Sequence, residues 1–170
     1  QKGLPTLLEG YLDFIKRPDV SETDKLKTKL IVGAGGPNPW DPNAEDWKKI
    51  KTLMGDIAKV NDGKYKNNAC YVNGFFPNRL ANSCMVSGFT SRYEPCGITP
   101  LESFAAGNYV HSIKTGGAPD FIKPISIDEI KDLENAGKSH TEIAETYLKD
   151  KTGFLTKDPF LLNAEALGVD

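Results

Sequence analysis

The chain has 170 residues, of which 39% are hydrophobic and 26% charged, and its formal net charge is −2. These values are ordinary for one globular domain with a substantial core, so stability requires neither disulfides nor a structural metal. Because the sequence shows no basic stripe, polybasic block or long apolar run, we expect neither a nucleic-acid-binding protein nor a membrane segment.

The cysteines and the first residues bear on compartment and completeness. Cys70, Cys84 and Cys96 are widely spaced and form no Cys-x-x-Cys pair. This pattern is typical of reduced thiols and predicts a cytoplasmic location rather than a disulfide framework or zinc site. The chain starts at Gln1 and enters a helical pattern almost at once, so we expect a fragment of a longer protein.

The first half of the chain alternates helical and strand-like segments. Apolar residues at 4–15 recur at helical spacing, and the apolar run at 29–36 (KLIVGAGG) predicts a buried strand that stops at glycines. Residues 44–61 predict an amphipathic helix with Asn43 as its N-cap. Residues 69–76 (ACYVNGFF) predict the next strand.

The second half continues the alternation. We expect a short helix at 77–83, a strand at 84–91, a helix at 98–107 ending at Gly107, a strand at 108–115 and a loop entering a helix at 116–122. This order predicts an α/β fold: a three-layer Rossmann-like parallel sheet with helices on both faces, in a single domain at 1–170. Glycine-rich corners follow three predicted strands, so right-handed crossovers would gather them at the carboxyl rim, where such sheets bind ligands.

Residues 124–151 interrupt this rhythm. Ser126 with Glu129, and Ser139 with Glu142, each match a capping box, in which the serine caps the helix and the glutamate reaches back. Gly137 separates the two segments. We therefore expect an inserted hairpin of two short helices whose charges are mostly solvated.

Several familiar sites are disfavoured. The run GAGGPN has Asn38 where the dinucleotide fingerprint needs glycine, and the chain contains no P-loop. His111 and His140 have no ligand partner at metal spacing, so we expect no metal site and no Ser-His-Asp triad. Cys96 has no nearby histidine to activate it and suits a tight turn better than a nucleophile.

The stretch EPCGITPLE has a different character. A helix beginning near Ile98 presents free backbone N–H groups and a positive dipole end, which bind phosphate, and Thr99 adds a hydroxyl. Glu94 precedes the turn and Glu102 lies one helical turn in, so both can face the rim. Two carboxylates beside an anion site suit a ligand with sugars on both sides of a pyrophosphate. A capped helix start without a ligand is the alternative.

Two further groups point to the same edge. Thr115, Gly116 and Gly117 again lead from a strand into a helix and predict a second backbone cradle for an anion. Lys2 adds a mobile cation at the N-terminal edge.

At this point the motifs resemble a known family. The stretch SRYEPCGITPLESFAAGNYVHSIKTGGAPDFI is similar to the C-terminal nucleotide-sugar domain of retaining glycosyltransferases with two Rossmann-like domains (the GT-B type). It looks most like the bacterial glycogen and plant starch synthases, whose motif runs Ser-Arg-Phe/Tyr-Glu-Pro-Cys-Gly-Leu/Ile-Thr and is followed later by Thr-Gly-Gly. The initial QKGL matches their Gln-Lys-Gly-Leu, and KTGFL resembles a later Gly-Phe segment. The resemblance covers residues 1–122 and resumes near 151.

The resemblance implies roles for residues of this chain around the transferred sugar. Glu94 would bind the hydroxyls of that sugar, with the backbone of Cys96 and Gly97 holding the same ring. Lys2 would contact the diphosphate of the donor, and the turn at 115–117 would lie against the sugar-phosphate. Glu94 and Lys2 are thus the expected catalytic residues.

The nucleotide end is implied in the same way. The backbone of Ile98 and Thr99 would meet the distal phosphate at the helix N-terminus. Glu102 completes a Glu-x7-Glu pattern of the broader retaining family, in which the second Glu binds the ribose. Phe75 or Phe76 is the expected platform for the base.

The resemblance is incomplete in three places. Glycogen and starch synthases usually lack a glutamate at the position of Glu102, which leaves donor base and sugar open. The insertion at 124–151 has no recognised equivalent. The first phosphate-binding arginine of the family lies upstream of Lys2, and the N-terminal acceptor domain is missing.

The implied function is transfer of glucose from ADP- or UDP-glucose to an α-glucan with retained anomeric configuration, using no metal or cofactor. The acceptor would bind through the missing N-terminal domain, so the fragment would be inactive alone. Alternatives are another retaining hexosyltransferase with a sucrose, lipid or glycan acceptor, and a non-catalytic nucleotide-sugar-binding module. A dinucleotide-dependent dehydrogenase is the third alternative and the least favoured.

Overall fold

The structure, a computed structural model, describes residues 3–34, 45–73, 80, 82–91 and 98–156. The chain divides into two compact units, one at Gly3–Asn78 and one built on Arg79–Asp170, and each is described by itself. We call them the N-terminal unit and the C-terminal unit. No helix in the described ranges is long and apolar enough to cross a membrane.

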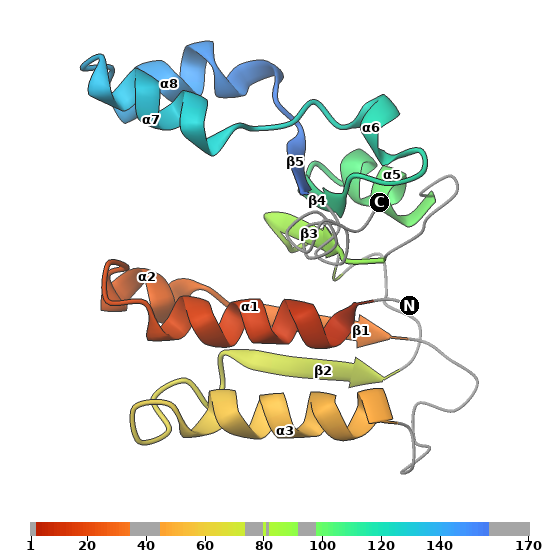
Figure 1. Cartoon of the computed structure of the whole chain (residues 1–170). Helices are drawn as coiled ribbons and strands as arrows, with labels where there is room; N and C mark the ends of the chain where they lie inside the picture. The colour runs from red at the N-terminus through yellow and green to blue at the C-terminus, as the bar shows by residue number, and fades with distance from the viewer. Residues whose placement is uncertain (1–2, 35–44, 74–79, 81, 92–97, 157–170) are drawn as a thin grey trace, which may run out of the picture. The chain divides into compact units, whose positions relative to one another are not determined.

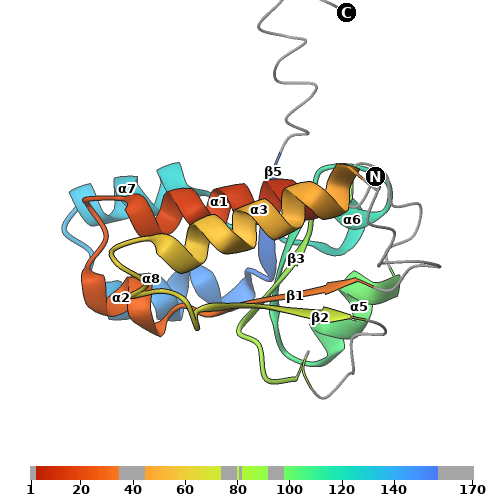
Figure 2. The same cartoon turned by 90° about the horizontal axis from the view of Figure 1, so that it is seen from below.

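The N-terminal unit is a βαβ element with extra helices (Figure 1). Strands β1 (Leu30–Ala34) and β2 (Ala69–Asn73) are parallel, and α3 (Glu45–Lys59) forms the crossover between them. Helix α1 (Leu4–Lys16) packs beside α3 on the same face of the two strands, as Figure 2 shows. The apolar core between these elements consists of Leu8, Tyr11, Ile15, Val32, Ile50, Leu53, Ile57 and Tyr65. The strands and helices predicted here from apolar periodicity are confirmed.

A short helix that the apolar pattern did not predict, α2 (Glu22–Lys27), precedes β1. Ser21 caps it, because its Oγ accepts a hydrogen bond from the Asp24 backbone N–H at 3.1 Å. The Ser-x-x-Asp spacing was the available signal. With only six residues, this helix depends on its caps and tertiary partners.

Asn68 supplies those partners at the C-terminal end of α2. Its buried side-chain amide lies 3.1–3.3 Å from the carbonyl oxygens of Lys25, Leu26 and Thr28. The main-chain carbonyl of Asn68 accepts a hydrogen bond from the backbone N–H of Leu30 at 2.8 Å. One residue thus satisfies carbonyls left free at a helix end and starts the β1–β2 ladder.

The C-terminal unit has a parallel sheet in the order β3 (Val86–Phe89), β4 (Tyr109–Ile113), β5 (Gly153–Thr156). Helix α5 (Ile98–Ala105) connects β3 to β4, and α6 (Ala118–Phe121) follows β4. Side chains of both helices pack on the sheet in one apolar cluster, formed by Phe89, Phe104, Val110, Ala118, Phe121, Ile122 and Leu155. Parallel sheets flanked by helices therefore confirm the predicted Rossmann-like α/β class.

Helix α5 ends where the sequence predicted. Gly107 has φ +84°, and its N–H donates to the Phe104 carbonyl at 2.9 Å. The N–H of Asn108 donates to the Ser103 carbonyl at 3.1 Å. These two bonds form a Schellman motif, which needs a residue that tolerates positive φ.

The predicted helical hairpin is confirmed within the crossover from β4 to β5. It consists of α7 (Ile127–Asn135) and α8 (His140–Thr146), followed by a 3₁₀ turn at Leu148–Asp150. Ser139 and Glu142 make the full capping box, but only half of the box forms at α7. There Ser126 Oγ accepts from the Glu129 N–H, while the Ser126 N–H donates to the Tyr147 hydroxyl at 2.9 Å.

Candidate functional site

The candidate site lies beyond the carboxyl ends of β3 and β4. These strands are adjacent and parallel, with Phe89 opposite Ser112. Helix α5 begins after β3, and the turn at 115–117 begins after β4. Since both connections leave the same end of a parallel sheet, the topology brings the start of α5 and this turn to one rim.

Helix α5 exposes the residues that the sequence assigned to ligand binding. Pro100 and Ser103 are buried, so this side of the helix packs on the unit. Ile98 (65% exposed), Thr99 and Glu102 are exposed. Ile98 and Glu102 are four residues apart and share one face of the helix. The first turn of α5 thus places backbone N–H groups that have no partner within the helix beside an exposed hydroxyl and carboxylate.

The turn at 115–117 has a backbone shape suited to an anion. Gly116 has φ +55°, whereas Gly117 has φ −79° and ψ −8°. Successive residues of opposite hand point their N–H groups to one side and form a nest. In the described part of the chain, no backbone or side-chain acceptor pairs with the N–H groups of Gly116 or Gly117. Because α6 has only four residues, the nest rather than a helix dipole is the feature of this turn that suits an anion.

The turn is held in place by β5. The Thr115 N–H donates to the Ile113 carbonyl at 2.8 Å, and the Lys114 N–H donates to the Thr156 carbonyl at 2.7 Å. Lys114 is exposed and directly precedes the nest, so the rim includes a cation that the sequence motifs did not indicate. The signal for it was a lysine directly after an apolar strand.

The remaining predicted site residues fall outside the described residues. They are Lys2, Phe75, Glu94, Cys96 and Gly97, together with the alternative platform Phe76. Their roles stay predictions. Of the set implied by the resemblance, the structure therefore places Ile98, Thr99, Glu102 and the turn at 115–117.

Neither histidine belongs to the rim chemistry. His111 is half-buried on β4, where burial lowers its pKa, and its Nε2 lies 3.2 Å from Thr156 Oγ1. The His140 side chain is 89% exposed, with Nε2 3.1 Å from a carboxylate oxygen of Glu134. Over the described ranges, no group of three or more His, Cys, Asp or Glu side chains could hold a metal ion.

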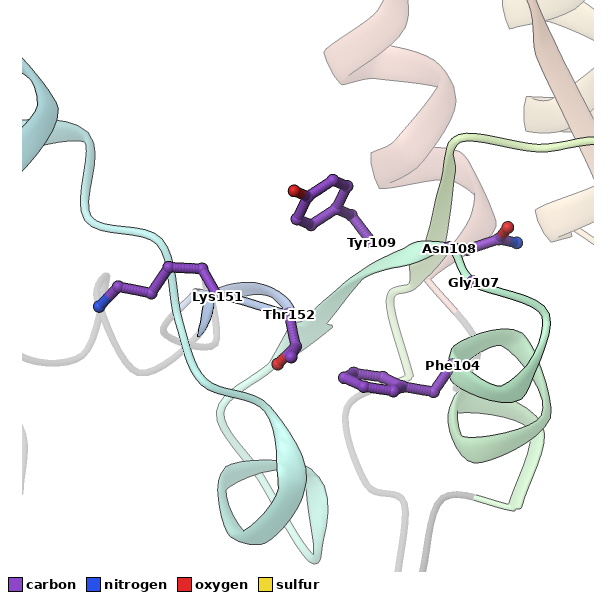
Figure 3. A pocket seen from close by; sticks show the side chains of 6 residues that line it. All are labelled: Phe104, Gly107, Asn108, Tyr109, Lys151 and Thr152. Atoms are coloured by element: carbon purple, nitrogen blue, oxygen red, sulfur yellow. The ribbon is translucent and has the colours of Figure 1, made fainter. Parts of the chain in front are cut away.

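A hollow of about 250 Å³ lies at the opposite edge of this sheet (Figure 3). Its lining comes from the end of α5, the start of β4 and the residues before β5: Phe104, Gly107, Asn108, Tyr109, Lys151 and Thr152. In Figure 3 the Tyr109 ring lies above Thr152 and the Phe104 ring lies to its right, and the Lys151 ammonium points away from both rings. The hollow is therefore separate from the carboxyl rim where the sequence places the donor.

Comparison with known proteins identifies the fold. No protein-family model and no curated protein matches the sequence. Similar solved structures include an α,α-trehalose-phosphate synthase (UDP-forming) from Burkholderia xenovorans in complex with glucose-6-phosphate (TM-score 0.53, 14% identity, 71% of this chain and 28% of that chain). Another is a trehalose-6-phosphate synthase studied for glycosyl transfer with retention (TM-score 0.54, 17% identity, 85% of this chain and 34% of that chain). An apo structure of OtsA is also similar (TM-score 0.50, 16% identity, 70% and 28%).

The likeness is one of fold. The parallel sheets and flanking helices of this chain form a Rossmann-like α/β fold that these solved structures share. The chain spans between 28% and 34% of the length of the chains in these solved structures. Similarity of fold at such low sequence identity does not establish an activity, so the activity has to be argued from the site.

Proposed function

We propose that the chain is the donor-binding part of a retaining hexosyltransferase, which transfers glucose from ADP- or UDP-glucose to an α-glucan as glycogen and starch synthases do. One observation carries the proposal. The exposed start of α5 and the nest at 115–117 leave neighbouring strands at the same rim of the sheet. Two groups of backbone N–H donors at one rim suit the two phosphates of a nucleoside diphosphate sugar.

In this proposal the donor lies along the rim with its diphosphate between the two backbone sites. The amides of Ile98 and Thr99 bind the distal phosphate, and the nest takes the sugar-phosphate. The exposed carboxylate of Glu102 binds the ribose hydroxyls, and Lys114 lies close enough in sequence to the nest to add a positive charge. On the motif resemblance alone, Phe75 is the expected platform for the base.

The sugar end rests on the motif resemblance. Glu94 binds the hydroxyls of the transferred glucose, the backbone of Cys96 and Gly97 holds the ring, and Lys2 reaches the diphosphate. As the glycosidic bond breaks, negative charge accumulates on the leaving diphosphate. Preorganised amides and Lys2 stabilise that charge without having to reorganise, which lowers the barrier to transfer.

The solved structures favour a second acceptor class. Two of the similar proteins are trehalose-phosphate synthases, and one is described with bound glucose-6-phosphate. Transfer to the hydroxyl of a sugar phosphate is therefore the second candidate for this chain. A sucrose, lipid or glycan acceptor and a non-catalytic nucleotide-sugar-binding module remain alternatives in the same fold.

The experiment uses the intact parent protein and the substitution Glu94→Ala. Release of nucleoside diphosphate is measured with ADP-glucose or UDP-glucose as donor and with a glucan primer or glucose-6-phosphate as acceptor. We expect transfer to the primer by the wild type, a loss of at least 100-fold in Glu94→Ala, and an unchanged circular dichroism spectrum. Transfer only to glucose-6-phosphate would select the second candidate, and no transfer to any acceptor with intact donor binding would select the non-catalytic module.

A further inference from the structure

The α7–α8 hairpin lies in the crossover from β4 to β5, away from the rim. In both views of Figures 1 and 2 it extends away from β5 within its own unit. Helix α7 buries no side chain, and α8 buries only Ile143. Both helix starts are capped, and Gly137 (φ +80°) fixes the turn between them. The hairpin is thus a preformed projection that contributes little to the core of the unit.

Acidic charge is concentrated in this part of the chain. Residues 124–151 contain seven acidic side chains and four lysines, a formal charge of −3, whereas the whole chain carries −2. The acidic residues are Asp128, Glu129, Asp132, Glu134, Glu142, Glu145 and Asp150, and the lysines are Lys131, Lys138, Lys149 and Lys151. The rest of the chain is therefore slightly positive, and the hairpin is the acidic segment.

A shallow groove of about 330 Å³ lies on the hairpin, and we call it the hairpin groove. It is lined by Glu129, Asp132, Leu133 and Tyr147. The half-buried Leu133 and Tyr147 give it an apolar floor, and the exposed carboxylates form its edge. The Tyr147 hydroxyl accepts the Ser126 N–H at 2.9 Å, which holds this ring in position.

The two carboxylates at the groove lack the close basic partners that three other acidic side chains of the hairpin have. Outside the groove, lysine ammonium groups lie 4.0 Å from Asp128 (Lys131) and 3.4 Å from Glu142 (Lys138), and the His140 imidazole lies 3.1 Å from Glu134. Among the described residues, Glu129 and Asp132 have no such ion pair. The groove therefore carries two negative charges that the hairpin itself does not neutralise.

A lysine of the chain itself already lies over Tyr147, one of the residues that line the groove. The Lys151 ammonium lies 4.5 Å from the centre of the Tyr147 ring, a cation–π contact. The ring face is thus a suitable surface for positive charge. Two unpaired carboxylates next to an apolar floor complement a cationic side chain with an apolar neighbour.

We propose that the hairpin groove is a docking site for a segment of a partner protein that presents an arginine or lysine beside a leucine-sized apolar side chain. The cation would pair with Glu129 and Asp132, and the apolar side chain would cover Leu133 and Tyr147. Exposed ion pairs contribute steering and specificity, while apolar contact contributes most of the affinity. Binding should therefore need both parts of the segment.

The test is an NMR titration of the ¹⁵N-labelled 170-residue chain with three synthetic peptides. One contains Arg-Leu-Leu-Arg, one reverses the charges (Glu-Leu-Leu-Glu), and one removes the apolar side chains (Arg-Ser-Ser-Arg). We expect only Arg-Leu-Leu-Arg to shift amide signals of Leu133 and Tyr147 in a saturable way. Glu129→Gln combined with Asp132→Asn should weaken that binding at least ten-fold. The matched control Asp128→Asn removes one charge from the same helix outside the groove and should leave binding within two-fold.

Each other outcome contradicts the proposal. Equal binding of the charge-reversed peptide would show that charge selects nothing, and equal binding of Arg-Ser-Ser-Arg would show ion attraction alone. Shifts away from the hairpin, or none with any peptide, would remove the groove as a docking site. Without peptide, amide shifts in the hairpin that depend on protein concentration, together with dimers in analytical ultracentrifugation, would show that a second copy of this chain occupies the groove. None of these outcomes bears on donor binding at the rim.

Discussion

A Cβ atom built on Gly153 would stand 1.8 Å from the carbonyl oxygen of Val110. These two residues are partners in the β4–β5 register. On its other side Gly153 forms a parallel bridge with Pro124, and its carbonyl accepts the Ile125 N–H at 2.7 Å. The main chain of Val110 thus leaves no room for a side chain at position 153, so β5 can pair with β4 in this register only with glycine there.

Gly153→Ala should therefore separate β5 from β4. Since the obstructing atom is backbone, we expect a loss of about 3 kcal/mol in the stability of the C-terminal unit. The direct readout is hydrogen exchange at Val110, whose N–H donates to the Thr152 carbonyl at 3.0 Å. The control Gly10→Ala places a methyl group in open space on α1 and should stabilise the N-terminal unit by about 0.5–1 kcal/mol. Unchanged Val110 protection in Gly153→Ala would contradict the packing described here.

Asn68→Ala should destabilise the N-terminal unit. The change removes the amide that bonds the carbonyls of Lys25, Leu26 and Thr28 and leaves them without that donor. We expect a loss of about 2–3 kcal/mol. Urea unfolding followed by tryptophan fluorescence measures it, because both tryptophans of the chain belong to this unit and Trp47 packs on Tyr71. Asn67→Ala alters an exposed neighbour and should change the unfolding midpoint little.

Glu22 should make the N-terminal unit sensitive to acid. Hydrogen bonds from Lys25, Lys64 and Tyr65 lower the pKa of Glu22 from 4.5 to about 2. Because the unfolded chain takes up the proton first, this contribution to stability is complete above about pH 4.5 and is lost as pH falls towards about 2. We expect the urea midpoint to fall over that window in the wild type and to fall less in Glu22→Gln. Asp56→Asn, an exposed change of equal charge on α3, serves as control. Parallel pH profiles of wild type and Glu22→Gln would refute the assignment.

Elements marked by an apolar stripe, an apolar run or a capping box could be predicted from sequence, whereas helix α2 and strand β5 were not. The apolar stripes of α1 and α3 and the continuous run of β1 are properties of the segments themselves. Helix α2 and strand β5 depend on partners distant in sequence: Asn68 binds the end of α2, and Val110 accommodates Gly153. No local pattern encodes such partners.

The candidate site also has features that the sequence predicted and features that only the structure shows. Alternation of strands and helices was enough to bring α5 and the turn at 115–117 to one rim. The opposite hands of Gly116 and Gly117, and the exposed Lys114 before them, are backbone and surface details that glycine content alone does not fix. The half-formed capping box at α7 is a similar case, because the Tyr147 hydroxyl replaces Glu129 as partner of the Ser126 N–H.

Donor binding at the rim is the central claim, and isothermal titration of the 170-residue chain with UDP-glucose and ADP-glucose tests it most directly. We expect weak saturable binding of at least one of them and none of NAD. Gly116→Ala puts a side chain at φ +55° and distorts the nest, so affinity should fall at least ten-fold. The matched control Gly137→Ala, at φ +80° in the hairpin turn, should bind as the wild type does. Failure of both nucleotide sugars to bind the folded wild-type chain, or equal affinity in Gly116→Ala and Gly137→Ala, would contradict the claim.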